Sequence, residues 1–269
     1  SDLDVVIHPK DLLRALTCLQ ELGYHVDHPP IHQLRGVRLQ QLVRRFHEHS
    51  LFAVRGGTPV KVDLHWRLSD DNDYFPTDFD ALLTSSASCV IGGRNVRTLS
   101  SVSQLTYLAF HAGGHQCHRL SWLFDFAVAA DRIADQEWNS LLTPMSPTIR
   151  RMVICVLLTL ESLSLTKPLD HRIDNVDQWR AALQPAVQAM IRCMTDDPGE
   201  LLGGAWNVGQ WRYRLTGRFR PWFNSMVKAV LPGPQDLLQP GLLSPYVSRW
   251  RYIVHKSMAS AVGASDGST

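Results

Sequence analysis

The feature that most constrains the fold of this chain is a change in hydrophobic periodicity near residue 100. Before it, short apolar runs typical of strands alternate with amphipathic segments typical of helices. After it, apolar residues recur three or four positions apart, which is typical of helices alone. We therefore predict an α+β fold, with a mixed sheet and helices in residues 1–100 and a helical bundle in residues 101–262. Residues 263–269 are expected to form a disordered tail.

Within the first part, the predicted order of elements is β-α-β-α-β-β. Residues 4–8 have the pattern of a buried strand, and Pro9 then opens a helix that Gly23 ends. The other elements expected are a β-rich piece at 24–26, a helix at 39–46, strands at 51–55 and 60–68 joined by a hairpin loop, a short helix at 79–83 and a hairpin around Gly92 and Gly93. This order predicts a mixed sheet with helices packed on it.

Composition narrows the functional classes. The formal net charge is only +2, so no global field draws the chain to nucleic acid or to a membrane. No apolar run reaches the length of a bilayer span, and no membrane partner is expected. The five cysteines are widely spaced and contain no CxxC pair, which argues against a disulfide framework or a zinc knuckle. Reduced thiols fit a cytoplasmic location.

Acidic residues lie at strand positions that could hold metal ions. Asp2 and Asp4 are two positions apart, so a strand points both carboxylates to one face. Asp63 and His65 share this spacing on a later strand. If the two strands are neighbours, three carboxylates converge, and such oxygen clusters bind Mg²⁺. On spacing alone, such a pair more commonly lies in a solvated turn.

Several longer blocks are more specific. They are the strand Ser1–Ile7, a helix ending in Leu22-Gly23-Tyr24, the Asp-Leu-His-Trp motif at 63–66, the block His111–His115 and the Arg-Leu-x-Trp-x-x-Asp pattern at 119–125. With these blocks the chain resembles a bacterial family of uncharacterised nucleotidyltransferases of the polymerase-β type. The resemblance implies a nucleotidyltransferase-like sheet, Mg²⁺ (or Mn²⁺) as cofactor and an NTP substrate, with ATP expected.

The resemblance also implies residue roles. Asp2 and Asp4 match the metal-binding carboxylate pair, and Asp63 matches the third carboxylate, which can help to deprotonate the acceptor. His65 falls on the family's His-Trp pair. The further candidates for nucleotide or acceptor contact are His65, His111, His115, Arg119 and Asp125.

Four of these candidates also fit roles that involve no nucleotide or acceptor. His111 and His115 have the i, i+4 spacing of a zinc pair, but Ala112 stands where a metalloprotease has glutamate, so a hydrogen-bonded pair in a cleft is favoured. Arg119 and Asp125 fit an interhelical ion pair at least as well as a ligand contact.

Two further groups have no firm role. His47 and His49 precede a strand, and a surface role and a site role are equally consistent with that position. The basic and aromatic stretch from Trp211 to Trp222 could contact RNA by charge and stacking. An amphipathic helix whose arginine stems cover the core is the favoured interpretation.

The family has an upstream segment with a small-residue loop that cradles the nucleotide phosphates. This chain opens directly in the Asp2 strand, and its Gly-Gly pairs lie in hairpins far from Asp2 in sequence. We therefore expect an upstream segment or a second polypeptide to complete the fold. We also expect an exposed sheet edge beside the Asp2 strand.

The resulting hypothesis is metal-dependent transfer of a nucleoside monophosphate from an NTP to an acceptor, with release of pyrophosphate. The helical part would select the acceptor, which could be a small molecule, a peptide, a protein or an RNA such as tRNA. The alternatives are a toxin–antitoxin component that modifies RNA or protein, a peptide-tailoring enzyme, and a non-catalytic binding module.

Overall fold

The structure is a computed structural model that describes residues 2–26, 34, 36–69, 78–114, 119–195, 210–217, 227, 231, 246–247 and 249–251. The chain divides into two compact units, residues 1–79 with 230–269, and residues 80–229. His115 and the predicted tail at 263–269 lie outside the described residues.

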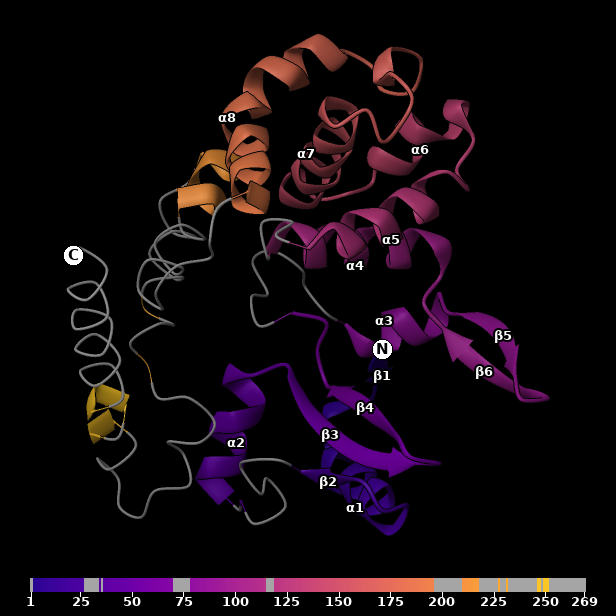
Figure 1. Ribbon diagram of the computed structural model, residues 1–269, viewed down its shortest axis with the longest axis vertical. Helices are drawn as coiled ribbons and strands as arrows, with labels where there is room; N and C mark the ends of the chain where they lie inside the picture. The colour runs from indigo at the N-terminus through magenta and orange to yellow at the C-terminus, as the bar shows by residue number, and fades with distance from the viewer. Residues whose placement is uncertain are drawn as a thin grey trace. The chain divides into compact units, whose positions relative to one another are not determined.

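The first unit contains a four-stranded mixed sheet (Figure 1). Its strands are β1 (Asp2–Val6), β4 (Thr58–His65), β3 (Glu48–Arg55) and β2 (His25–Val26), in that spatial order. β1 pairs with β4 in parallel, and the other pairs are antiparallel. The α+β fold with a mixed sheet is thus confirmed. Within the described sheet, β1 is an edge strand, as expected.

Local chemistry sets the connection from β1 into the first helix. A short 3-10 helix, η1 (Pro9–Asp11), leads into α1 (Leu12–Glu21). His8 caps this start, because its Nδ1 accepts a hydrogen bond from the Lys10 backbone N–H at 3.1 Å. Gly23 ends the helix at φ +79°, a conformation that a side chain would strain.

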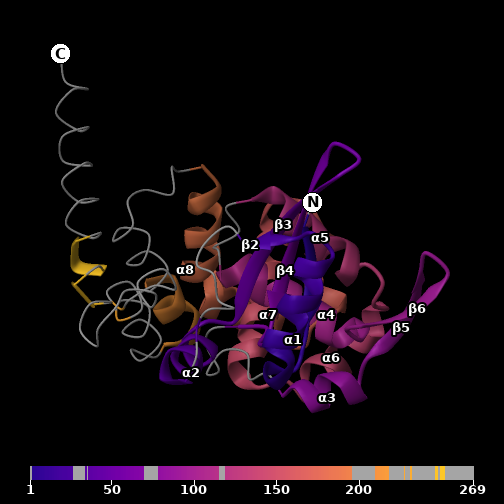
Figure 2. The same cartoon turned by 90° about the horizontal axis from the view of Figure 1, so that it is seen from below.

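Leucines and one tryptophan join the sheet to its helices. Leu12 and Leu16 of α1, with Leu42 of α2 (Gly36–Arg45), are buried against sheet residues that include Leu51 and Leu64. α1 and α2 appear beside the sheet in both ribbon views (Figures 1 and 2). Trp66 is also buried in this cluster, and its indole N–H donates to the Val43 carbonyl at 3.1 Å.

This apolar cluster decides which way the polar side chains point. Side chains alternate along a strand, so when Val62 and Leu64 face the helices, their neighbours face the opposite side. Asp63 and His65 therefore lie on the opposite face of the sheet from the helices. The fold thus provides a polar face whose residues are set by the packing of the apolar one.

The second unit is mainly helical, as the predicted fold class requires, but it begins at residue 80 and so includes elements that were predicted for the first part. α3 (Phe79–Thr84) runs from the first unit into the second and leads to a hairpin of β5 (Ala87–Ile91) and β6 (Arg94–Thr98). The helices that follow are α4 (Ser101–Gly114), α5 (Leu120–Ala130), η3 (Asp135–Glu137), α6 (Trp138–Leu142), α7 (Pro147–Ser162), η4 (Leu169–His171) and α8 (Val176–Thr195). Residues 210–216 form a further helical segment.

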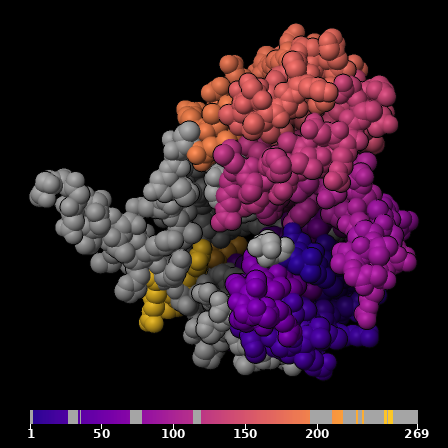
Figure 3. Space-filling model, turned by 45° about the vertical axis from the view of Figure 1, so that its right-hand side comes forward, coloured from indigo at the N-terminus to yellow at the C-terminus, as the bar shows by residue number. Residues whose placement is uncertain are grey.

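α7 is the central helix of the second unit. Ser146 caps its first turn by accepting from the Ile149 N–H at 3.4 Å, and every residue from Met152 to Leu160 is buried. Arg180 of α8 bonds the carboxylates of Glu161 and Asp170, which ties α8 to α7 and to η4. In Figure 3 the helical segments, coloured magenta to orange, form a continuous packed surface. No helix among the described residues is long and apolar enough to cross a bilayer.

Gly113 provides a test of packing in this unit. A Cβ at this position of α4 would clash with the Met152 Sδ and lie 3.0 Å from the Trp211 ring. Alanine normally favours a helix over glycine by about 1 kcal/mol. Here we expect Gly113→Ala to lower the free energy of unfolding by about 1–3 kcal/mol, the usual cost of overpacking a core.

Urea denaturation followed by circular dichroism measures this change. Ser121→Ala, on the exposed side of α5, is the control and should stay near wild type. If Gly113→Ala were as stable as the wild type or more stable, the close packing of Gly113 against Met152 and Trp211 would be contradicted.

Candidate functional site

The polar face of the first unit's sheet assembles the candidate site. The parallel register pairs Asp4 with Asp63, and Asp2 with Lys61. The antiparallel register of β3 and β4 adds Ser50 opposite Asp63. Because residues paired across a ladder point to the same face, Asp4, Asp63 and Ser50 share one face. The sequence left open whether the two acidic strands are neighbours, and the structure shows that they are.

Asp63 is the most buried carboxylate of this face, with a relative exposure of 6%. Its Oδ1 accepts a hydrogen bond from the Ser50 hydroxyl at 2.5 Å, and its Oδ2 lies 2.6 Å from the Lys61 ammonium. A buried carboxylate is costly unless it is paired in this way. Lys61 therefore supplies the positive charge that balances Asp63 in this structure.

His65 connects two carboxylates at the end of β4. Its Nε2 is 3.5 Å from Asp4 Oδ1 and 3.3 Å from Glu48 Oε2. Burial by itself lowers the pKa of His65, but the contact with Asp4 and the negative charges of Glu48 and Asp63 outweigh burial. The pKa of His65 therefore lies above its ordinary value, and the charged imidazolium is favoured next to these acids.

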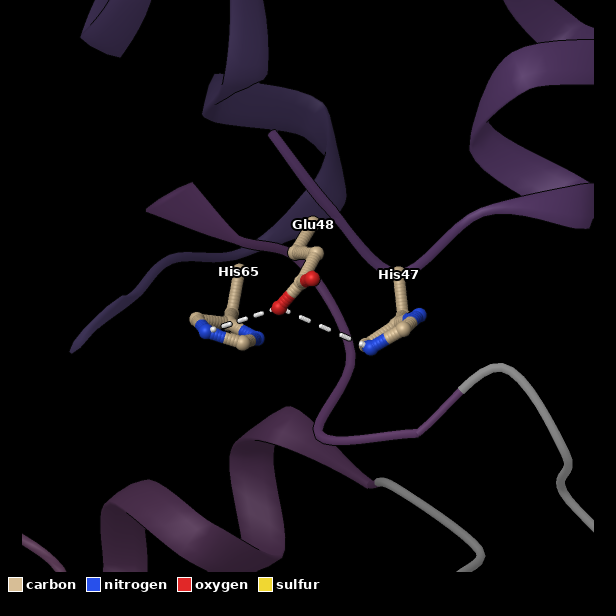
Figure 4. Close-up of side chains that lie close together, drawn as sticks. All are labelled: His47, Glu48 and His65. Carbon is tan, nitrogen blue, oxygen red and sulfur yellow. Dashed lines mark ion pairs between the residues drawn. The ribbon is translucent and has the colours of Figure 1, made fainter. Parts of the chain in front are cut away.

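Glu48 lies between two imidazole rings. Figure 4 shows its carboxylate flanked by His65 on one side and His47 on the other, with His47 Nε2 3.6 Å from Glu48 Oε2. Burial raises the pKa of Glu48, and the negative charges of Asp63 and Asp4 add to this effect, against the opposing charges of His65 and Lys61. These three residues are also a group whose ligand atoms all lie within 4.8 Å of one another.

His49 lies within β3 and not before it, which corrects the prediction from the sequence. Its side chain points to the opposite face of the sheet from those of Glu48 and Ser50. Its side chain is 9% exposed, and within the described part of the chain its Nε2 has no hydrogen-bond partner. Desolvation lowers the pKa of His49 to about 4, although the charge of Asp63 opposes this shift. His49 is therefore a neutral core residue at pH 7, and the site role considered for it receives no support.

The other predicted contact residues lie in the second unit. His111 of α4 stacks edge-on against Trp122 of α5, with ring centroids 4.9 Å apart. The Arg119 guanidinium lies over the same Trp122 ring, 5.3 Å from its centroid. No ion pair joins Arg119 to Asp125 among the described side chains. Contact of His111, Arg119 and Asp125 with a nucleotide or an acceptor stays a prediction.

The donor set of the polar face suits a divalent cation. Asp4 and Asp63 provide adjacent carboxylates on one face, and hard oxygen donors are what Mg²⁺ and Mn²⁺ prefer. Lys61 and His65 are the basic side chains that lie against these carboxylates in this structure. A cation would therefore replace charges that the chain supplies itself.

Comparison with known proteins identifies the family. A family model described as "Uncharacterised nucleotidyltransferase" matches residues 1–163. The chain belongs to this nucleotidyltransferase family. The match covers the whole polar face described above and the helices α4 and α5. No curated protein and no solved structure matches the chain at a significant level.

Three members of this polar face were not predicted from the sequence. Lys61 and Ser50 became candidates only when their strand partners were known, and Glu48 was passed over beside His47. A signal was present for Lys61, because the alternation Lys61, Asp63, His65 places all three on one face. Nothing in the sequence alone showed that Glu48 lies opposite His65.

The pKa of His49 has a consequence for stability. When folding lowers the pKa of a group, that group stabilises the folded protein fully at pH values above its unfolded pKa. This stabilisation is lost as the pH falls toward the pKa of the folded state. We therefore expect part of the free energy of unfolding, of the order of 3 kcal/mol at most, to be lost between about pH 6.5 and pH 4.

Urea denaturation at several pH values, with a chelator present, measures this loss. His49→Gln should flatten this part of the profile, whereas His25→Gln, an exposed site on β2, should keep the wild-type slope. Identical slopes in all three proteins would rule out His49 as the cause.

Proposed function

We propose that this chain transfers a nucleoside monophosphate from an NTP, with ATP expected, to a hydroxyl or phosphate of an acceptor. The observation that carries the proposal is the parallel register of β1 and β4, which brings Asp4 beside Asp63 on one face. The nucleotidyltransferase family gives this geometry its chemical meaning. A solvated turn, the alternative for an isolated acidic pair, does not apply to carboxylates held on adjacent paired strands.

In the proposed reaction, an acceptor oxygen attacks the α-phosphorus of the NTP. The bond from that phosphorus to the bridging oxygen breaks, and its electron pair leaves with pyrophosphate. Asp2, Asp4 and Asp63 would hold Mg²⁺ (or Mn²⁺), which neutralises charge on the phosphates when bound. Asp63 would accept the acceptor proton, and Lys61 lies beside it to balance charge. Positioning and charge neutralisation suffice for phosphoryl chemistry of this kind.

The acceptor is proposed by class only: a small molecule, a peptide, a protein or an RNA such as tRNA. Labelled NTPs incubated with the chain, Mg²⁺ and a cell extract would reveal which class becomes labelled. Nuclease-sensitive label indicates RNA, and protease-sensitive label of high mass indicates a protein. Protease-sensitive label of low mass indicates a peptide, and protease-resistant label of low mass indicates a small molecule. Label in RNA or protein would extend the proposal to a toxin–antitoxin role, and label in a peptide to a peptide-tailoring one.

A non-catalytic binding module is the second candidate. One observation favours it, namely that both oxygens of Asp63 already have partners, Ser50 and Lys61. A module would bind a nucleotide or a metal ion without turnover. Binding measured by calorimetry, together with an absence of any labelled product, would support the module over the enzyme.

Asp4 allows the enzymatic proposal to be tested. Asp4→Asn keeps the size of the side chain but removes the charge that the cation requires. Electrostatic contributions of this kind are typically worth about 3 kcal/mol or more, so we expect transfer to fall at least about a hundredfold.

The assay is formation of labelled product with Mg²⁺ or Mn²⁺. Glu21→Gln, at the exposed end of α1, is the matched control and should keep wild-type activity. Unfolding curves of both variants show whether a loss reflects stability. Wild-type turnover by folded Asp4→Asn would refute the assignment.

A further inference from the structure

A second set of side-chain atoms of the kinds that bind metal ions lies at the end of the sheet, next to the carboxylates proposed to hold Mg²⁺. His47 directly precedes β3, Glu48 is the first residue of β3, and His65 is the last residue of β4. We propose that these three side chains bind a divalent transition-metal ion, such as Zn²⁺ or Co²⁺, at a site of their own. The proposal does not depend on nucleotidyl transfer, because it concerns different ligands and a different class of ion.

The backbone holds these three ligands in fixed relative positions. Glu48 and His65 are partners in the β3–β4 register. His47 is tied to the same place, because its carbonyl accepts hydrogen bonds from the Trp66 N–H at 2.9 Å and the Arg67 N–H at 3.3 Å. Buried Trp66, packed in the leucine cluster, anchors the end of β4. A site built on paired strands in this way is pre-arranged, which favours ion binding.

The distances between the ligand atoms suit a small ion. Glu48 Oε2 lies 3.6 Å from His47 Nε2 and 3.3 Å from His65 Nε2. In a tetrahedral complex with bonds of about 2.0–2.1 Å, neighbouring ligand atoms are about 3.4 Å apart. Both of these separations match this value. One ligand atom from each of the three residues lies within 4.8 Å of the other two.

The ligand types define the class of ion. Two imidazoles with one carboxylate are a set found at zinc and iron sites, whereas Mg²⁺ takes oxygen ligands almost exclusively. Three protein ligands also leave a coordination position for water or another small ligand. The Glu48 side chain is 43% exposed and His65 only 3%, so an ion could reach the site from the Glu48 side.

The two sets of ligands meet at His65. Its Nε2 is 3.5 Å from Asp4 Oδ1, so an ion held by His65 would lie beside one of the carboxylates assigned to Mg²⁺. The contacts seen here also fit a proton shared between His65 and its acids. Metal and proton compete for the same nitrogen, so an experiment that adds the ion distinguishes the two.

Cobalt(II) is the probe, because its visible absorption reports nitrogen ligands and coordination geometry. The chelator-treated full chain is titrated with Co²⁺, and Zn²⁺ is then added to displace it. We expect one equivalent of Co²⁺ to bind with a visible absorption band. His47→Gln and Glu48→Gln should each weaken binding by more than about tenfold, the least that loss of an outer-shell partner costs.

Three further variants complete the experiment. His25→Gln, an exposed histidine on β2, should bind Co²⁺ as wild type does. His65→Gln should abolish binding, but this residue is buried, so His47→Gln and Glu48→Gln carry the test if it fails to fold. Asp63→Asn should lose nucleotidyl transfer and keep the Co²⁺ band.

The outcomes separate the two proposals. A Co²⁺ band that is absent from wild type, or unchanged in His47→Gln and Glu48→Gln, overturns the transition-metal site and leaves the transfer reaction untouched. A band that depends on these residues, in a chain without transfer activity, supports the metal site and refutes the enzymatic proposal alone.

Discussion

The parallel pairing of β1 with β4 is the interaction on which the rest of the candidate site depends. The backbone register alone places Asp4 beside Asp63 and Val6 beside His65. A shift of one residue would turn every side chain of β1 to the other face of the sheet. The register is secured because Val5 of β1 and its partner Leu64 of β4 both pack in the leucine cluster. The leucine cluster on one face of the sheet therefore determines which side chains form the candidate site on the other face.

Charge balance is the second constraint on the polar face. Asp63 is nearly buried, and its two oxygens are satisfied by Ser50 and Lys61. His65 is more buried still and lies between Asp4 and Glu48. Acids and cations are thus interleaved, and each compensates the desolvation of the next. A metal ion bound at this face would have to displace Lys61 and His65 from the carboxylates. Its affinity would therefore depend on the free energy needed to break these contacts.

The second unit is stabilised by close packing of helices around an apolar core. Its core is a helix, α7, buried along nine consecutive residues from Met152 to Leu160. Close packing around it leaves no space for a side chain at Gly113. The aromatic and cationic group of His111, Arg119 and Trp122 lies at the α4–α5 pair of this unit. Aromatic rings beside a guanidinium are suited to binding planar or cationic ligands. Contact of these helices with the acceptor or the nucleotide stays a prediction.

Much of this protein could be predicted from its sequence. Period-two and period-3.6 patterns act locally, so the existence and order of the strands, the first helix and its stop at Gly23, the hairpins and the helical character of the C-terminal part were predicted. The observed strand bounds differ from the predicted ones by one to three residues. The Asp4 and Asp63 positions were predicted for the same reason, since alternation along one strand determines a face.

The tertiary structure alone decided which strands are neighbours. Pairing joins residues that are far apart in the chain, and no local pattern encodes it. Glu48 therefore meets His65, and Ser50 and Lys61 meet Asp63, only once the sheet has formed. His49 shows the same limit of prediction from sequence. It directly follows Glu48 in the chain, but its side chain lies on the opposite face of the sheet, where it is buried and neutral. Alternation could suggest that separation, but burial depends on the helices that cover the sheet.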